Sequence, residues 1–370
     1  MLIQKDTAAA DGILYAFYDL AAAPNTFDVF VFLILAEIER RETECEAFHL
    51  YVVRGPNCGL RADADVTNLA RQQYMLGNVV LGSRALMPTC SGVTLCSTRE
   101  YVERLLHVEA MYGNGSRLVF PPGYSVHFPL RHYFLCQLAE RWERGAEIPG
   151  LQPTDYGLTL VDRFLRSCCG DRKVVTVTLR EASVQPERNS NLGEWGRFVA
   201  TLDPNAYAVL ILRDLEKINE PLPPALARCL PYPEAVVSIE LRAALYHRAY
   251  LNLCVSNGPA EILKLDPQTR YLIFKTMTEG VSCTSVEHHR KYQWLNPGDQ
   301  IHFATPFQRL VWEDDRAEVL AREFTSMVNL IEGGRYATRA AIDGYLRERR
   351  ERWIELYPGG WRETAGGAAG

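Results

Sequence analysis

Residues 250–276 of this chain read YLNLCVSNGPAEILKLDPQTRYLIFKT, and they decide the predicted fold. A short apolar run ends at Ser256, Asn257 and Gly258, a helix-compatible segment with proline in its first turn follows, and a second apolar run covers 271–274. Strand, glycine turn, helix and strand in this order indicate a parallel α/β sheet. Glycine lets a ligand approach the backbone closely, and the free N–H groups of a helix start attract anions. We therefore expect these three turn residues to bind a phosphorylated ligand.

A related pattern occurs about 75 residues earlier, in residues 173–191, KVVTVTLREASVQPERNSN. Residues 174–179 alternate and are rich in β-branched side chains, which favours a buried strand. Arg180 follows that strand, and Arg188 and Asn189 come just before an amphipathic segment. Guanidinium groups match phosphate oxygens in geometry, so two arginines beside a helix start are suited to a diphosphate. Surface arginines in an ordinary loop are the alternative for either segment alone, but two such loops at strand ends favour a nucleotide site.

Composition restricts the class of protein. The chain has 370 residues, 47% of them hydrophobic and 23% charged, which is typical of a globular protein of about two domains. A formal net charge of −5 argues against nucleic acid as the main partner. Ten cysteines without a C-x-x-C pair favour reduced thiols in a cytosolic protein. The first residues lack the pattern of a signal peptide.

Strand and helix patterns alternate along the chain, which predicts parallel sheets with helices on their faces. The fold class we expect is α/β, with two Rossmann-like, doubly wound domains that face a cleft and C-terminal helices that pack back on them. The predicted parts are an N-terminal acceptor-side domain, a nucleotide-sugar domain, bridging helices and a disordered tail, at residues 1–148, 149–315, 316–357 and 358–370. The strands predicted in the second domain are residues 174–179, 207–212, 235–239, 251–255 and 271–274.

Several segments of the chain resemble bacterial GT-B-like proteins described as glycosyltransferases of surface-polysaccharide loci. The matching segments are YDLAAAPNTFD (18–28), PTCSGVTLCSTRE (88–100), FPPGYSV (120–126), TLREASVQPERNSN (178–191), VSNGP (255–259) and TPFQRLVWEDD (305–315). A more distant likeness connects VSNGP with the Asp-Thr-Gly-Pro turn of heptosyltransferases, and the Arg180 segment with the arginine motif of α-1,6- and protein O-fucosyltransferases. The chain departs from both motifs, with Ser256-Asn257 in place of Asp-Thr and Leu179-Arg180-Glu181 in place of His-x-Arg-Arg.

The resemblance implies transfer of a sugar from a nucleotide-sugar donor to a glycan or lipid-linked glycan, with inversion and without a metal. Such proteins neutralise the leaving diphosphate with arginine, lysine and helix-start amides. Lys275, directly after the strand 271–274, is a candidate for that role, and Gln308 is a candidate for contact with the base or ribose. Two other functions stay open: a non-hydrolysing sugar-nucleotide epimerase, and a non-catalytic binding or scaffold protein on the same frame.

Inverting transfer also requires a base for the acceptor hydroxyl. Asp19 closes the first predicted strand, and heptosyltransferases place a base carboxylate at a similar position. Asp28, in the first turn of the following predicted helix, is another candidate, although favourable interaction with the helix dipole is the alternative. Glu181 is the third candidate, although an ion pair with its neighbour Arg180 is the alternative. The histidines at 288, 289 and 302 lack metal-ligand spacing, so we predict solvated side chains and no metal site.

The last predicted helix carries arginines at 339, 347, 349, 350 and 352, which favour contact with an anionic membrane surface. Interspersed glutamates favour a helix that forms ion pairs with itself. We therefore expect a cytoplasmic protein that makes at most peripheral contact with the inner membrane surface.

Overall fold

The computed structural model describes residues 12–112, 118–358, 360 and 361. The chain divides into two compact units, Met1–Tyr133 and Phe134–Gly370. Each unit contains its own parallel β-sheet, and each is described separately below. Two parallel sheets with helices on their faces make this a mixed α/β fold of Rossmann-like type, which confirms the predicted α/β class with two Rossmann-like domains.

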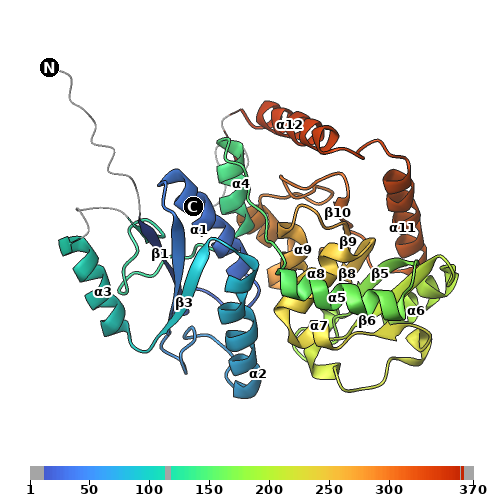
Figure 1. The fold of residues 1–370 in the computed structure, drawn as a ribbon, viewed down its shortest axis with the longest axis horizontal. Helices are drawn as coiled ribbons and strands as arrows, with labels where there is room; N and C mark the ends of the chain where they lie inside the picture. Colours follow the sequence, from blue (N-terminus) through green and yellow to red (C-terminus); the bar gives the residue numbers. More distant parts are fainter. Residues whose placement is uncertain (1–11, 113–117, 359, 362–370) are drawn as a thin grey trace. The chain divides into compact units, whose positions relative to one another are not determined.

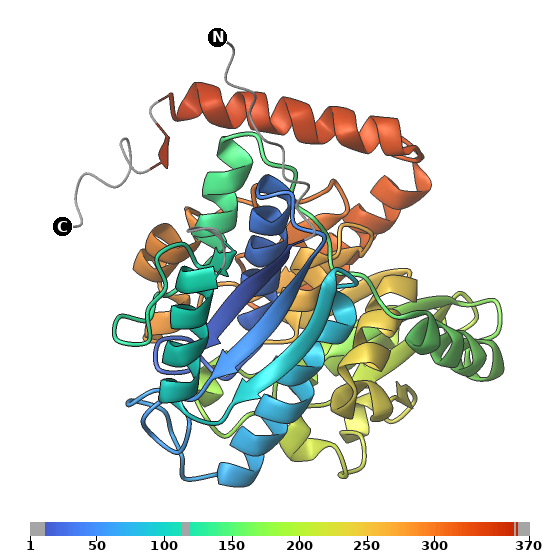
Figure 2. The same cartoon turned by 60° about the vertical axis from the view of Figure 1, so that its left-hand side comes forward.

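The first unit is built on a four-stranded sheet in the order β3-β2-β1-β4, with every pair parallel. Figure 2 brings these strands to the front of the view. Its elements are β1 (Ile13–Asp19), α1 (Val29–Glu42), β2 (Ala47–Val53), α2 (Leu69–Tyr74), β3 (Cys90–Cys96), α3 (Arg99–Tyr112) and β4 (Val119–Phe120). Helix α2 continues into a π-helical segment, Met75–Leu81, and a 3-10 turn, Gly82–Leu86.

Helix α1 fills the core on one face of this sheet, because all ten of its residues from 29 to 38 are buried. Tyr18 of β1 meets Phe32 of α1 edge to face, with ring centroids 5.1 Å apart. On the opposite face Phe17 stacks on Tyr124 at 4.8 Å, next to Val102 of α3. Alternation along β1 therefore sends its side chains into two different hydrophobic layers.

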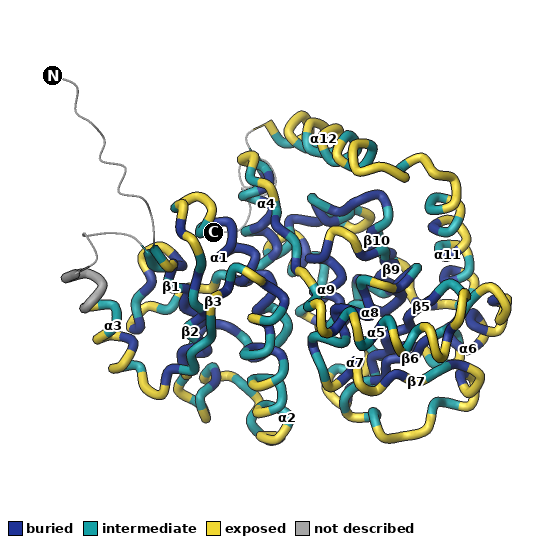
Figure 3. The backbone as a smooth tube through the Cα atoms, viewed as in Figure 1, coloured by how far each residue is buried: buried dark blue, intermediate teal, exposed yellow. Residues whose placement is uncertain are grey.

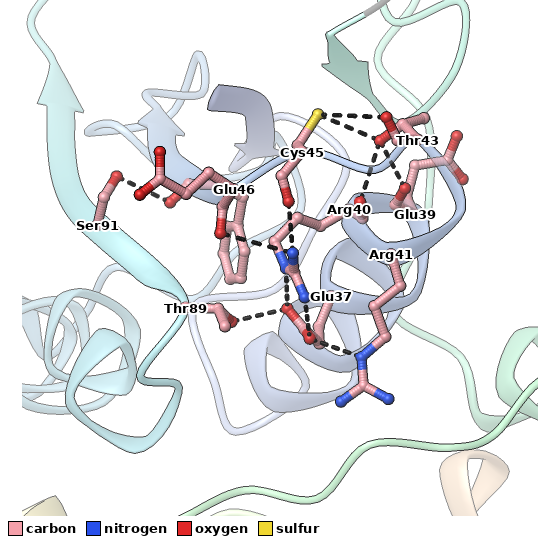
Figure 4. Close-up of polar contacts among 10 residues, drawn as sticks. Glu37, Glu39, Arg40, Arg41, Thr43, Cys45, Glu46, Thr89 and Ser91 are labelled. Atoms are coloured by element: carbon pink, nitrogen blue, oxygen red, sulfur yellow. Dashed lines mark hydrogen bonds and ion pairs between the residues drawn. The ribbon is translucent and has the colours of Figure 1, made fainter. Parts of the chain in front are cut away.

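A buried carboxylate fixes the end of α1 to the start of β3 (Figure 4). Glu37 is 2% exposed and accepts hydrogen bonds from Arg40 Nε, Arg41 Nε and Thr89 Oγ1, each at 2.7 Å. Arg40 also donates to the carbonyl of Cys45. Burial alone would raise the pKa of Glu37, but the hydrogen bonds from Arg40, Thr89 and Arg41 outweigh it and hold this pKa below its ordinary value.

The second unit is built on a six-stranded parallel sheet in the order β10-β9-β8-β5-β6-β7 (Figure 1). Its strands are β5 (Lys173–Thr178), β6 (Tyr207–Leu212), β7 (Leu230–Pro231), β8 (Leu251–Val255), β9 (Tyr271–Phe274) and β10 (Gln308–Leu310). Its helices are α4 (Leu135–Glu143), α5 (Asp155–Cys168), α6 (Leu192–Thr201), α7 (Glu234–Val237), α8 (Ile239–Arg248), α9 (Ala260–Leu265), α10 (Val286–His288), α11 (Ala317–Glu332) and α12 (Arg339–Leu356).

The central strand β5 shows how the second sheet is covered on both faces. Val175 and Val177 pack in the hydrophobic layer formed with α6 and α11, which contains the fully buried Trp195. On the other face Thr178 Oγ1 lies 2.8 Å from the hydroxyl of Tyr246 in α8, and Thr176 donates to Asn252 of β8 at 2.6 Å. Strands β5, β8 and β9 are accordingly buried along almost their whole length (Figure 3).

One predicted strand of the second unit is wrong. Residues 235–239 form the short helix α7 and the start of α8, because the hydroxyl of Ser238 accepts from the backbone N–H of Leu241 at 3.3 Å and caps α8. The edge strands β7 and β10 were not predicted, since two or three residues give too short a pattern.

The division between the units falls after Tyr133, and the helix α4 that precedes residue 148 belongs to the second unit. Phe134 stacks on Tyr292 at 4.4 Å, and Trp142 meets the ring of His302 at 5.7 Å. Among the C-terminal helices, α11 packs on α6, with Phe324 against Phe198 at 5.5 Å. Helix α12 is tied to α4 by Trp353, which donates to Glu143 at 2.6 Å.

The predicted tail, 358–370, lies for the most part outside the described residues. Trp361 is described, and it is 4% exposed and stacks on Trp353 at 5.6 Å. Within the described ranges, none of the helices combines the length and the apolar character that crossing a bilayer would require.

Candidate functional site

The candidate site lies at the carboxyl edge of the second sheet, where three parallel strands end side by side. Thr178, the last residue of β5, pairs with Cys254 of β8, and Val255 pairs with Phe274, the last residue of β9. The loops after these strands therefore leave the sheet at one edge. They carry Arg188, Ser256 and Lys275, and we call this region the carboxyl-edge site.

Arg188 connects two of these loops. It ends a 3-10 turn, Pro186–Arg188, and its Nη2 donates to the carbonyl of Ser256 at 3.2 Å. Its Nη1 donates to Gln185 Oε1 at 3.0 Å and to Cys283 Sγ at 3.3 Å. Nε is buried and has no hydrogen-bond partner among the described residues. A buried donor without an acceptor is costly, and an anionic oxygen is the acceptor that best satisfies a guanidinium.

Lys275 connects the loops after β9 and β5. Its Nζ donates to the carbonyl of Asn189 at 3.2 Å, and its backbone has a φ of 50°, in the left-handed region. A lysine in that region costs about 1 kcal/mol relative to a right-handed conformation, and such strain is found at functional sites more often than elsewhere. Within the described part of the chain, neither Lys275 nor Arg188 forms an ion pair with a carboxylate. Two cations without counter-ions therefore share this edge.

The glycine turn itself is partly a structural element. Asn257 is 9% exposed, and its side chain accepts from the backbone N–H of Ala260 at 3.0 Å, which closes the turn before α9. The backbone N–H of Ser256 is used in the sheet, since it donates to the carbonyl of Phe274 at 2.9 Å. Gly258 is exposed. Of the three predicted turn residues, Ser256 and Gly258 therefore lie at the accessible side of the carboxyl-edge site, and Asn257 shapes the turn.

Arg180 holds the loop that carries Arg188. Its guanidinium donates to the carbonyls of Val184 and Gln185 at 2.6 and 2.9 Å and to the side chain of Asn189 at 2.5 Å. The side chain of Asn189 in turn accepts from the backbone N–H of Ala182 at 3.1 Å and donates to its carbonyl at 2.9 Å. Arg180 is only 8% exposed. The structure therefore gives Arg180 and Asn189 the role of shaping this loop (residues 182–190, the Arg180 loop).

Glu181 pairs with Arg213 instead of its neighbour Arg180. Arg213 Nε donates to Glu181 Oε2 at 2.9 Å, and both side chains are 9% exposed. The pair connects the end of β5 to the residue that follows β6.

Gln308 lies at the opposite edge of the sheet from the carboxyl-edge site. It is the first residue of β10 and pairs with Tyr271, the first residue of β9. Its side chain is buried and donates to the carbonyl of Asp266 at 2.9 Å. The predicted contact of Gln308 with the donor is therefore corrected: its position at the amino ends of parallel strands places it a strand length from Ser256 and Lys275.

In the first unit, Asp19 lies at the carboxyl end of β1, as the strand pattern predicts. It is 2% exposed and forms a two-pronged ion pair with Arg99, with both distances 2.9 Å. Tyr124 donates to its Oδ2 at 2.7 Å, and the backbone N–H of Ala21 donates to its Oδ1 at 2.9 Å. The bonds from Arg99 and Tyr124 join β1 to α3 and to the segment after β4, and the bond from Ala21 closes the turn after β1.

The histidines are packed rather than solvated, contrary to the sequence prediction. His289 and His302 are 2% and 3% exposed. Burial lowers the pKa of His288 to about 4, with His289 and Arg188 adding to the effect. Within the described ranges, no three His, Cys, Asp or Glu side chains are grouped as metal ligands would be.

Two residues at the carboxyl-edge site were not predicted. Cys283 contacts Arg188, and the carboxylate of Asp315 accepts from the backbone N–H of Asn191 and from Trp195 Nε1, each at 2.8 Å. Asp315 thereby fixes the start of α6 next to the Arg180 loop. The position of Asp315 at the end of the TPFQRLVWEDD segment was the one sequence signal for a role of this residue. Nothing in the sequence around Cys283 indicates that it contacts Arg188.

Comparisons with known proteins give structural matches only. No protein-family model matches the chain, and no curated protein matches it. Solved structures similar to it include the ADP-heptose lps heptosyltransferase II of E. coli, at 9% identity over 87% of this chain and 100% of that one, with a TM-score of 0.49. Another is a glycosyl transferase of family 9 from Veillonella parvula, at 10% identity over 72% and 81%, with a TM-score of 0.45.

A third similar structure is that of a Listeria monocytogenes protein described as a UDP-N-acetylglucosamine 2-epimerase. Its identity is 9% over 95% of this chain and 98% of that one, with a TM-score of 0.37. Transferases and an epimerase thus occur among the matches. At these identities the fold class rests on the two parallel sheets themselves, and the chemistry has to be argued from the residues.

Proposed function

We propose that this protein is a glycosyltransferase of GT-B type, which binds the diphosphate of a nucleotide-sugar donor at the carboxyl-edge site. The acceptor in this proposal is a glycan or a lipid-linked glycan. The transfer is inverting and uses no metal. We also propose that the protein is cytoplasmic and makes at most peripheral contact with the inner membrane surface. It has no nucleic-acid partner in this proposal.

One observation carries the proposal: Arg188 and Lys275 lie on neighbouring loops at one sheet edge, and neither pairs with a carboxylate among the residues that the structure describes. Ligands of open parallel α/β sheets bind outside the carboxyl ends of the strands. A leaving diphosphate carries concentrated negative charge, which a guanidinium and an ammonium stabilise without a bound metal. The buried, unpartnered Nε of Arg188 is a donor that a phosphate oxygen would satisfy.

The carboxylates that could serve as base in this reaction are both bound to arginines, Asp19 to Arg99 and Glu181 to Arg213. The role of base stays a prediction for each of them. Asp19→Asn tests it most directly, because loss of transfer with intact donor binding supports the role. Unchanged turnover would exclude it.

Calorimetric titration with nucleoside diphosphates and their sugars tests the donor proposal. Arg188→Ala should weaken binding of the best nucleotide by about tenfold to a hundredfold, because a charge-assisted hydrogen bond contributes roughly 1.5–3 kcal/mol. Lys275→Met should act in the same direction. Arg166→Ala, which removes an exposed arginine of α5, is the matched control and should leave the affinity unchanged.

Two results would contradict the proposal. The first is equal affinity of wild type and Arg188→Ala for every nucleotide. The second is binding that disappears when a chelator is added, because the cations of the carboxyl-edge site would then not be sufficient. Formation of an epimerised nucleotide sugar in the absence of acceptor would move the assignment to an epimerase.

A further inference from the structure

The second unit contains a pocket that shares no residue with the carboxyl-edge site. It has a volume of about 290 Å³ and lies between α12, α4 and the segment before β10. Its lining includes Trp142, Asp299, His302, Glu348, Arg352 and Trp353, and we call it the α12 pocket. That volume is near the lower end of small-molecule sites, about 300–1,000 Å³, and suits one or two rings.

Aromatic side chains form part of the lining of the α12 pocket, which we call its aromatic wall. The ring of His302 lies edge to face between Trp142, at 5.7 Å, and Trp353, at 4.3 Å. Trp353 is held in turn by its bond to Glu143 and by stacking on Trp361. Because these rings are fixed by packing, the wall is formed before any ligand arrives, which lowers the entropic cost of binding.

The backbone beside the pocket is also fixed. Arg349 donates to the carbonyls of Gln300, Ile301 and His302, at 2.7, 3.0 and 2.9 Å. These bonds attach α12 to the segment that runs beside β10. Arg349 is therefore used in positioning the backbone of the pocket.

The lining also includes polar side-chain groups that have no partner among the described residues. Within the described part of the chain, the side chains of Glu348 and Arg352 form no ion pair or hydrogen bond, although both residues line the pocket and are exposed. The Nε2 of His302 is buried and likewise has no partner among the described residues. A carboxylate accepts, a guanidinium donates, and a neutral imidazole does either.

The formal charges of the lining cancel. Asp299 and Glu348 balance Arg349 and Arg352, so the pocket has no net charge that would favour an anion over a cation or either over a neutral molecule. A neutral ring with several hydroxyl groups fits this set, because each hydroxyl both donates and accepts. Its apolar C–H face would lie against the aromatic wall.

We propose that the α12 pocket binds one or two sugar residues of a glycan. The site is distinct from the proposed donor site and does not depend on it. In a glycosyltransferase such a pocket would hold the acceptor chain and raise its local concentration. In a binding protein it would be a lectin-like site.

Fluorine NMR of protein labelled with 5-fluorotryptophan tests the proposal, since the chain has six tryptophans and hence six signals. The probes are glucose, galactose, rhamnose and N-acetylglucosamine with their disaccharides, at up to tens of millimolar. At least one sugar should shift the signals of Trp142 and Trp353, while the signal of the fully buried Trp195 stays in place. Trp→Phe substitutions at 142 and 353 assign the two signals.

Substitution of Arg352 should leave the fold intact, because its side chain is exposed. Arg352→Ala should weaken sugar binding by about tenfold, because it removes a charged donor, and Glu348→Gln by several-fold. Arg347→Ala, on the same helix but outside the pocket lining, should leave binding unchanged. Nucleotide binding should also be unchanged in Arg352→Ala, which separates this proposal from the donor proposal.

No shift of the Trp142 and Trp353 signals with any sugar would overturn the proposal. So would shifts produced by a nucleotide alone, which would make the α12 pocket a nucleotide site. Equal sugar affinity in wild type and Arg352→Ala would also overturn it, because binding would then lie elsewhere.

Discussion

Replacing Arg180 by alanine should loosen the loop that carries Arg188 without removing a contact to the donor itself. The substitution deletes the bonds to Val184, Gln185 and Asn189, which are three of the interactions of a guanidinium that is 8% exposed. Each such bond contributes about 1–1.5 kcal/mol net. Allowing for partial replacement by water, we expect local opening of the Arg180 loop to become easier by about 2–4 kcal/mol.

Hydrogen exchange followed by mass spectrometry measures this effect. Backbone amides of the Arg180 loop should exchange about 30- to 1,000-fold faster in Arg180→Ala, since about 1.4 kcal/mol corresponds to tenfold. Arg180→Lys keeps the charge but loses the planar fork, so its effect should be intermediate. Donor affinity should fall in the same order. Unchanged exchange in Arg180→Ala would refute the assignment of Arg180 as the residue that shapes the loop.

Three further predictions concern carboxylates and Gln308. Asp19→Asn should lower the free energy of unfolding by about 2–4 kcal/mol, because it leaves the Arg99 guanidinium without its charged partner; a denaturant titration equal to wild type would contradict this. The folded-state pKa of Glu37 lies below its unfolded value of 4.5, so its contribution to stability is full above that value and is lost as pH falls through the folded pKa. Glu37→Gln should remove this part of the acid dependence of stability. Gln308→Ala should destabilise the protein yet leave nucleotide affinity unchanged, as calorimetry would show.

The sequence was sufficient for most of the sheet framework. The bounds of β6, β8 and β9 match the predicted strands residue for residue, and β1 ends at Asp19 as predicted, because each is an apolar run that ends at a clear turn signal. The strand predicted at residues 235–239 is wrong because its pattern has no such clear signal. Their short run of apolar and β-branched residues is ambiguous between helix and strand, and the serine within it acts as a helix cap.

The candidate site was predictable only as a location. Residues that follow parallel strands must gather at one edge, so Arg188, Ser256 and Lys275 could be placed together from the pattern alone. The direction in which each side chain points could not be predicted from the pattern. Arg180 donates to its own loop, and Glu181 pairs with Arg213, which is 32 positions away in the sequence. Such choices depend on loop geometry, which neither propensity nor spacing determines.

Photo-crosslinking tests the central claim most directly. A nucleoside diphosphate with a photoreactive group on its terminal phosphate would be bound to the full chain, irradiated and mapped by peptide mass spectrometry. We predict crosslinks within residues 183–191, 255–260 and 275–284, competed by the unmodified nucleotide and reduced in Arg188→Ala. Competed crosslinks confined to the first unit, with none in these three segments, would contradict the account.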